Sequence, residues 1–172
     1  KEKNEELEND LVMARELQQA FVLTEFPTYP GNALLEESQI QFGRIYIPCG
    51  AVGGDCIDIH RISEHKIGVF MGDVSGHGLR AALVVSSLRG LFEQLSDSAD
   101  NPGKFITQLN KSFASIFRLN ERFMFVSCFY CVLDFEHQEI QFTNAGHPTP
   151  YILHRENREV EAIKDTNGIQ RP

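Results

Sequence analysis

Seven residues, Gly72-Asp-Val-Ser-Gly-His-Gly78, constrain the fold of this chain more than any other stretch. They follow an apolar run over Lys66–Met71, which predicts a buried strand, and they precede Leu79–Leu95, which has helical spacing and no proline. Three glycines in seven residues let the backbone adopt positive φ and let a ligand approach the main chain closely. The pattern therefore predicts a strand, a tight turn and a helix, with Asp73 at the end of the strand.

A second acidic residue, Asp55, follows two glycines and opens another strand-like run, Cys56–Ile62. With a turn near Ser63–Lys66, the two runs predict an antiparallel hairpin in which Asp55 enters the first strand and Asp73 leaves the second. Two carboxylates held side by side repel each other unless a cation lies between them. Because carboxylate and carbonyl oxygens are ligands of hard divalent cations, the hairpin predicts a metal site at Asp55 and Asp73.

The bulk composition sets limits on the function. At 172 residues, with 42% hydrophobic and 23% charged residues, the chain is predicted to be one soluble globular domain with a short attachment. A net charge of −8 argues against nucleic acid as the main partner. The longest apolar run, Phe123–Leu133, is too short to span a bilayer, and the N-terminus does not read as a signal peptide, so we expect a cytoplasmic location.

The cysteines are interpreted as core thiols in a reducing compartment. Cys128 and Cys131 have redox-motif spacing, but they lie in an apolar strand pattern, where residues three apart point to opposite faces. The alternative is redox or zinc chemistry at Cys128 and Cys131. The other two cysteines, Cys49 and Cys56, do not form a second closely spaced pair that would complete a zinc site.

Residues 1–24 are predicted to be helical, and residues 25–172 to form the main domain. The residues that would form a coiled-coil seam are spaced alternately by four and three positions, at Leu7, Leu11, Ala14, Gln18 and Phe21. We interpret the helix as the end of a linker from an upstream sensor or receiver domain, and pairing of two such helices would make a homodimer. The alternative is an amphipathic helix packed on the domain itself.

Further strands and one helix are predicted from alternation and apolar runs. The predicted strands are Ser38–Ile47, Phe123–Asp134 as a central strand, Glu139–Ala145, and a hairpin of Tyr151–His154 with Val160–Ile163. Asn101 and Pro102 predict the start of a second helix, as N-cap and first-turn residue. Because its apolar residues cover more than one face, the helix over Leu79–Leu95 is expected to be well buried.

This order of elements excludes a doubly wound parallel sheet, which requires strict alternation of strand and helix. It predicts an α+β fold in which two antiparallel sheets pack together with helices outside.

A series of short motifs, in this order, resembles the protein phosphatase 2C superfamily, and most closely its bacterial SpoIIE/RsbU branch. The motifs are Tyr46-Ile-Pro48, Val52-Gly-Gly-Asp55, Gly72-Asp-Val-Ser-Gly-His-Gly78, Ala81-Ala82, Leu109-Asn110, Phe125-Val126 and Asn144-Ala-Gly-His-Pro148. The resemblance implies an α/β/β/α sandwich with two Mn²⁺ or Mg²⁺ ions between the sheets.

The resemblance also implies the ligands and the reaction. Asp55 and Asp73 would bind by carboxylate, with Asp73 bridging both ions, and Val74 by its backbone carbonyl, where many relatives have glycine. Two such ions activate a water for in-line displacement on phosphoserine or phosphothreonine, without a phosphoenzyme. The implied substrate is a phosphorylated regulatory protein of a bacterial signalling pathway, such as a STAS-type anti-sigma-factor antagonist.

The chain departs from this pattern at its end. Relatives continue past a turn at the place of Gly168 with further strands and a helix that carry an Asp-Gly pair and another acidic ligand. We therefore expect a domain that is incomplete at its C-terminus, and a fragment that is inactive while its parent is a phosphatase. The alternative is a non-catalytic, phosphatase-like scaffold that binds a protein partner. A metal-dependent phosphodiesterase is a weaker third reading, because no histidine-rich ligand set is present.

Two histidines are further candidates. His77 could donate a proton to the leaving serine oxygen, although a loop-shaping hydrogen bond is the favoured interpretation. Asn144 and His147 follow a predicted strand and are interpreted together as loop architecture, with the Asn side chain satisfying backbone groups.

Two other polar residues are assigned no catalytic role. Asp58 lies three residues beyond Asp55 and is expected to point the other way, as a surface carboxylate, with support of the metal site as the alternative. Ser75 is not predicted to be a nucleophile, because no His/Asp pair accompanies it in the pattern.

Overall fold

The computed structural model describes residue 9 and residues 11–18, 25–48, 50–117 and 124–163. Residue 9 and residues 11–18 are helical, as predicted, and the other residues of the predicted N-terminal helix lie outside the described residues. The later elements are β1 (Asp55–Arg61), β2 (Lys66–Val74), α2 (Leu79–Gln94), a 3-10 turn (Ser96–Ser98), α3 (Pro102–Phe117), β3 (Val126–Asp134), β4 (Glu139–Ala145), β5 (Tyr151–His154) and β6 (Glu159–Ala162).

The strands form two antiparallel sheets. β1, β2, β3 and β4 make a four-stranded sheet in that order, and β5 pairs with β6 in a separate two-stranded sheet. The predicted β1–β2 and β5–β6 hairpins are confirmed, and β3 lies inside the larger sheet, as its apolar pattern predicted.

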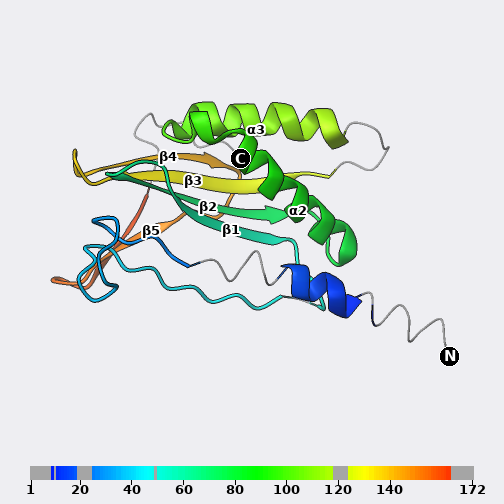
Figure 1. Ribbon diagram of the computed structural model, residues 1–172, viewed down its shortest axis with the longest axis horizontal. Coiled ribbons are helices and arrows are strands. Elements are labelled where there is room, and N and C mark those ends of the chain that lie inside the picture. The colour runs from blue at the N-terminus through cyan, green and yellow to red at the C-terminus, as the bar shows by residue number, and fades with distance from the viewer. Residues whose placement is uncertain (1–8, 10, 19–24, 49, 118–123, 164–172) are drawn as a thin grey trace.

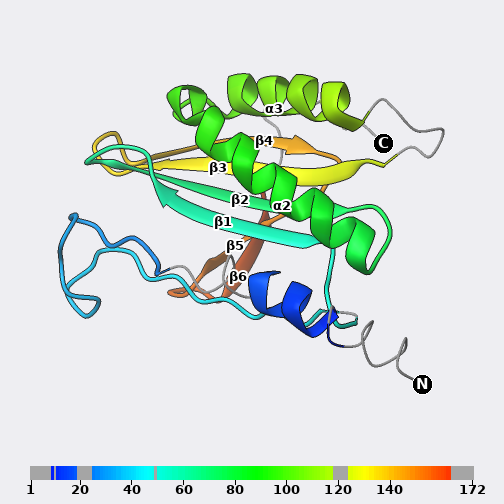
Figure 2. The same cartoon turned by 45° about the vertical axis from the view of Figure 1, so that its right-hand side comes forward.

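The helices and the smaller sheet lie on opposite sides of the four-stranded sheet. Both views place α2 and α3 over one face, and β5–β6 with the helix at residues 11–18 on the other side (Figures 1 and 2). This arrangement confirms the predicted α+β class with two antiparallel sheets and outer helices.

The main core lies between the helices and the four-stranded sheet. Phe70, Phe105 and Tyr130 are its largest fully buried side chains. The aromatic rings of Phe105 and Tyr130 lie 4.5 Å apart, which joins α3 to β3. Helix α3 begins where predicted, because the side-chain oxygen of Asn101 accepts a hydrogen bond from the backbone N–H of Lys104 at 2.9 Å.

The strand predicted at Ser38–Ile47 is wrong. This segment has no regular secondary structure, and the side chains of Ile45 and Ile47 are 86% and 81% exposed. The hydroxyl of Ser38 donates to the carbonyl of Ile40 and accepts from the N–H of Tyr29, so local contacts replace the pairing that a strand requires.

The expectation that α2 is well buried holds for only one side of the helix. Leu79 and Leu83 are 46% and 60% exposed, whereas Val84, Leu88 and Leu91 pack into the core. A helix that covers a single sheet face buries only the side that faces the sheet. None of the helices in the described part of the chain is both long and apolar enough to cross a bilayer.

Candidate metal centre

Three polar residues form a row across the end of the four-stranded sheet. Asp55 in β1 is the direct cross-strand partner of Asp73 in β2, and Asp73 is the direct partner of Ser127 in β3. Residues directly opposite each other in antiparallel strands point to the same face. Their strand neighbours Cys56, Val74 and Cys128 are buried under the helices, so the row faces the other way, toward the side of the smaller sheet. The structure therefore brings Asp55 and Asp73 together as the hairpin predicted.

The electrostatics of the row reflect this closeness. Partial burial raises the pKa of the Asp55 carboxyl, the negative charge of Asp73 raises it further, and His147 lowers it. Burial also raises the pKa of the Tyr46 hydroxyl, with the charge of Asp55 as the second cause. Asp55 therefore has a like charge on one side and an imidazole within electrostatic reach.

Gly54 leaves room for the oxygen atoms that surround the row. A Cβ on this residue would lie 2.7 Å from the backbone oxygen of Val74 and 3.5 Å from Oδ1 of Asp73. The N–H of Val74 donates to the carbonyl of Gly54 at 3.1 Å, which fixes the residue before β1 against the end of β2. The Val74 carbonyl thus lies near the aspartate pair, and any side chain at position 54 would displace it.

These residues fit a divalent cation. Two carboxylates and a backbone carbonyl are hard oxygen donors, the type that Mg²⁺ and Mn²⁺ take. The hydroxyl of Tyr46 is buried without a hydrogen-bond partner among the described residues, so it is free to bond to a water or an anion there. In the described part of the chain, however, no three or more His, Cys, Asp or Glu side chains gather as a metal cluster.

The N-terminal helix is bound directly to the loop that carries Asp55. The side-chain amide of Gln18 donates to the carbonyl of Gly53 at 2.7 Å, and its oxygen accepts from the N–H of Gly53 at 2.9 Å. Gln18 is 6% exposed, which is unusual for a glutamine. The sequence analysis placed Gln18 in the seam of the helix and did not predict its contact with Gly53. The only sign of this contact in the sequence is that a polar residue occupies a seam position that is usually apolar.

Two other residues of the glycine-rich turn, His77 and Ser75, were considered for a catalytic role in the sequence analysis. His77 is exposed between β2 and α2. The hydroxyl of Ser75 accepts from the N–H of Phe125 at 3.0 Å, and its own N–H donates to the carbonyl of Phe125 at 2.9 Å. Ser75 therefore ties the turn to the start of β3. Gly76 and Gly78 adopt φ of +94° and +75°, as the turn requires.

Asn144 closes the loop after β4, as predicted. Its side chain accepts from the N–H of His147 at 2.8 Å and donates to the carbonyl of the same residue at 3.0 Å. The imidazole of His147 has a different contact, because its Nδ1 lies 3.2 Å from Oγ of Ser127. The sequence analysis interpreted Asn144 and His147 together as loop architecture. In the structure Asn144 closes the loop, whereas the imidazole of His147 contacts Ser127.

The interpretation of Asp58 as a surface carboxylate is wrong. Asp58 is 9% exposed, forms an ion pair with Arg89 of α2, and lies 2.6 Å from Nδ1 of His60. It points toward the helices, as expected from its offset to Asp55, but that face is covered. An arginine 31 residues away was not visible as its partner in the sequence.

The cysteines are buried core thiols. Burial raises the pKa of Cys56 to about 12 and those of Cys128 and Cys131 to about 11, which makes the thiolate scarce. Cys128 and Cys131 point to opposite faces of β3, as predicted; Cys49 lies outside the described residues.

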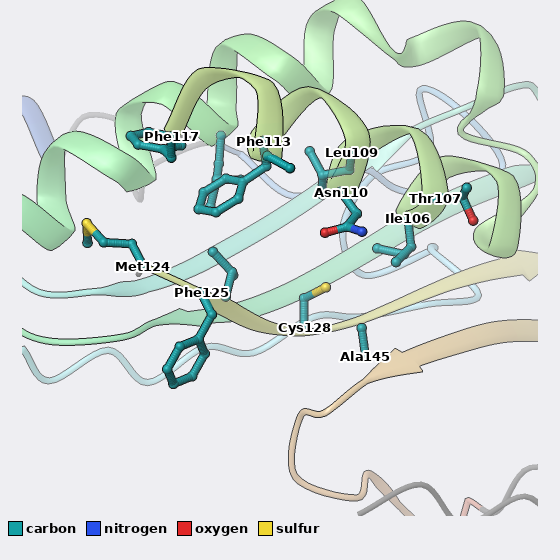
Figure 3. Close-up of a pocket in the computed structure, with 13 residues that line it drawn as sticks. Ile106, Thr107, Leu109, Asn110, Phe113, Phe117, Met124, Phe125, Cys128 and Ala145 are labelled. Atoms are coloured by element: carbon teal, nitrogen blue, oxygen red, sulfur yellow. The ribbon is translucent and has the colours of Figure 1, made fainter. Parts of the chain in front are cut away.

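A separate cavity of about 620 Å³ lies on the helix side of the sheet. It is lined mainly by apolar side chains of α3 and β3, including Ile106, Phe113 and Cys128, with the polar Thr107 and Asn110 (Figure 3). The row of Asp55, Asp73 and Ser127 faces the opposite side, so this cavity is not part of the candidate metal centre.

Two curated relatives are similar to this chain in sequence. Phosphoserine phosphatase RsbP of Bacillus subtilis is 29% identical over 147 residues, which cover 78% of this chain and 36% of RsbP. Phosphoserine phosphatase RsbU of the same organism is 24% identical over 155 residues, covering 89% of this chain and 42% of RsbU. The chain thus spans less than half the length of either relative.

Solved structures show the same fold. The RsbU and RsbW domains of Rv1364c from Mycobacterium tuberculosis match with a TM-score of 0.56 and 26% identity, over 69% of this chain and 32% of that one. The PP2C phosphatase domain of SpoIIE from Bacillus subtilis, solved with a fragment of its regulatory domain, matches with a TM-score of 0.51 and 22% identity, over 69% and 33%. The profile of the family named Stage II sporulation protein E (SpoIIE) matches residues 63–169, more than half of the chain. The chain therefore belongs to the SpoIIE family.

Proposed function

We propose that this chain is the catalytic part of a Mn²⁺- or Mg²⁺-dependent phosphoserine/phosphothreonine protein phosphatase. The observation that carries the proposal is the direct pairing of Asp55 with Asp73 beside the Val74 carbonyl. Burial and the like charge of Asp73 raise the pKa of Asp55, and a bound cation would offset the repulsion between the two carboxylates. Asp55 and Asp73 would hold the metal by their carboxylates, and Val74 by its backbone carbonyl.

The chain's own residues would prepare the site for a phosphorylated protein. When bound, the cations supply Lewis acidity, which activates water and offsets the negative charge of the phosphoryl group. Gly54 keeps the approach to the Val74 carbonyl and the Asp73 carboxylate open. Ser75 holds the glycine-rich turn against β3, so that Asp73 keeps its place when a substrate enters.

The proposed substrate is a phosphorylated regulatory protein, such as a STAS-type anti-sigma-factor antagonist. Two curated relatives are named phosphoserine phosphatases, which supports this substrate class. We further propose that an upstream sensor or receiver domain controls the site through the N-terminal helix. The two hydrogen bonds between Gln18 and Gly53 support this route, because they join the helix to a residue two positions before Asp55.

A non-catalytic scaffold that binds a protein partner is the second candidate. The observation in its favour is the small donor set, which comprises only two carboxylates and a carbonyl in the described residues. Under this reading Asp55 and Asp73 would be remnants of a metal site and would not support turnover.

The two readings differ in metal-dependent turnover. The experiment is phosphate release from a phosphoserine protein and from p-nitrophenyl phosphate by the full-length protein with Mn²⁺. The phosphatase reading predicts Mn²⁺-dependent release that falls by at least about 100-fold in Asp73→Asn. Metal-independent release, or equal release by Asp73→Asn, would refute it. Absence of turnover together with retained binding of a partner protein would support the scaffold.

A further inference from the structure

We propose that His147 is the proton donor to the serine oxygen that leaves when the phosphate ester is cleaved, and that Ser127 holds its imidazole in position. The inference rests on the proposed phosphatase function and assigns a residue to one step of that reaction. It starts from the contact between Oγ of Ser127 and Nδ1 of His147, at 3.2 Å.

The position of Ser127 brings His147 to the aspartate pair. Asp55, Asp73 and Ser127 are successive cross-strand partners, so their side chains leave the same face at the same level of the sheet. His147 contacts the third member of this row from the loop that follows β4. The charge of His147 also lowers the pKa of Asp55, which places the imidazole within electrostatic range of the first member.

The loop itself does not need the imidazole. Its closure depends on Asn144, whose side chain bonds both the N–H and the carbonyl of His147. In addition, a bridge between Cys128 and Gly146, which has a φ of +75°, fixes the loop against β3. The backbone of His147 is thus anchored by other groups, and its side chain is aimed at Ser127 without a structural requirement to be histidine.

The contact with Ser127 suits a proton donor in both of its protonation states. A serine hydroxyl can donate or accept, because its hydrogen rotates. It accepts from Nδ1–H when the imidazole is protonated, and it can donate to a bare Nδ1 when the ring is neutral. One ring nitrogen is therefore occupied by Ser127, and Nε2 is left to meet the substrate. This is the arrangement in which a third group orients a catalytic histidine.

The proposed step is balanced as follows. The oxygen of a water attacks phosphorus, and the bond between phosphorus and the serine oxygen breaks with its electron pair on that oxygen. The serine oxygen takes the proton from Nε2 of His147, so that the products are a serine hydroxyl and inorganic phosphate, which keeps the two protons of the water until it loses one to solvent. Solvent then returns a proton to His147. The structure favours His147 over His77 for this role, because His77 is exposed and has no comparable anchor in the described residues.

Two substrates with different leaving groups test the step in the full-length protein with Mn²⁺. A serine alkoxide needs a proton to leave, whereas p-nitrophenolate is stable without one. We expect His147→Gln to lower kcat on a phosphoserine protein by about 100-fold or more, and on p-nitrophenyl phosphate by less than about tenfold. The matched control His137→Gln, an exposed histidine at the β3–β4 turn, should change neither rate.

Equal losses of kcat on both substrates in His147→Gln would overturn the inference and leave the phosphatase function standing. So would unchanged kcat on the phosphoserine protein, or a selective loss on phosphoserine in His77→Gln instead. A wild-type protein without metal-dependent turnover would overturn the proposed function, and this inference with it.

A second readout does not depend on activity. In the metal-free protein, the ¹⁵N chemical shifts of the His147 ring report which nitrogen carries hydrogen and whether Nδ1 is hydrogen-bonded. We expect Ser127→Ala to shift the Nδ1 resonance of His147 and to leave that of His137 unchanged. An unchanged Nδ1 resonance would show that Ser127 does not position the ring, and would overturn that half of the proposal.

Discussion

Asp55 and Asp73 are direct partners across the β1–β2 hairpin, and the charge of Asp73 adds to the burial that raises the pKa of Asp55. The fold thus places two like charges at one end of a sheet, where nothing in the hairpin itself compensates them. Such a pair weakens the metal-free protein and favours a cation. The predictions below concern the residues that shape this pair and the scaffold that holds it.

Gly54→Ala is expected to damage the site without unfolding the domain. The new Cβ would lie 2.7 Å from the Val74 oxygen, so the carbonyl or the β1 entry must move. A displacement of this size predicts a loss of about 100-fold in Mn²⁺-dependent turnover. Gly90→Ala is the matched control, since a Cβ there meets open space in the middle of α2. Its free energy of unfolding should rise by about 1 kcal/mol with full turnover. Full turnover in Gly54→Ala would contradict the placement of the Val74 carbonyl.

Gln18→Ala is expected to loosen the link between the N-terminal helix and the Asp55 loop. It removes the hydrogen-bond partner that both the N–H and the carbonyl of the buried Gly53 have among the described residues. We expect a loss of about 2 kcal/mol in the free energy of unfolding and faster hydrogen exchange at Gly53. Glu16→Ala, an exposed neighbour on the same helix, should have no such effect. Identical exchange in both variants would show that the helix does not hold the loop in solution.

Arg89→Met is expected to destabilise the domain strongly. It removes the arginine of the ion pair from Asp58, a residue that is 9% exposed, and leaves only the imidazole of His60 beside the carboxylate. Removal of one member of a buried pair costs about 3–5 kcal/mol, which urea denaturation would measure. The double variant Asp58→Asn/Arg89→Met should recover part of this loss, because no unpaired charge remains. If the two substitutions are simply additive, the pair is not coupled.

Protonation of Asp134 is expected to lower the free energy of unfolding of the domain at acid pH. The carboxylate of Asp134 accepts hydrogen bonds from the backbone N–H groups of Glu136 and His137, and Nζ of Lys66 lies 3.4 Å from its Oδ2. The hydrogen bond from the backbone of His137 is the main cause that holds the pKa of Asp134 at about 2. A pKa below the ordinary value favours the folded state above about pH 4. This stabilisation is lost as the pH falls toward 2.

The measurement is acid denaturation of Asp134→Asn beside the wild type. At pH 7 the variant should have the lower melting temperature, and the gap should narrow as the pH is lowered from about 4 to 2. The exposed Asp97→Asn serves as control, with no gap at either pH. A gap that widens on acidification would contradict the assignment.

Features that depend on neighbouring residues in the sequence, such as the hairpin and the start of α3, were predicted correctly. Glycines around the two aspartates, and the lengths of the runs between them, were enough to pair Asp55 with Asp73. Asn101 and Pro102 likewise marked the start of α3, because capping is a local interaction. The hairpin pattern predicted a metal site at Asp55 and Asp73, and the family resemblance added the expectation of a second ion and of the Val74 carbonyl as a ligand.

The errors and omissions concern contacts between distant segments. Alternation over residues 38–47 suggested a strand, but a strand needs a neighbour with free hydrogen-bonding groups, and none pairs with this segment in the described structure. Asp58 read as a surface residue because its partner Arg89 comes from another element. The contact of His147 with Ser127 spans two strands and a loop, so it becomes visible only once the sheet register is known.

Calorimetric titration of Mn²⁺ into the full-length protein and into Asp73→Asn tests the central claim most directly. The account predicts saturable binding by the wild-type protein that is lost or weakened at least about 100-fold when the Asp73 carboxylate becomes an amide. Binding of equal affinity and stoichiometry in both proteins would contradict it, because the metal would then lie away from the aspartate pair.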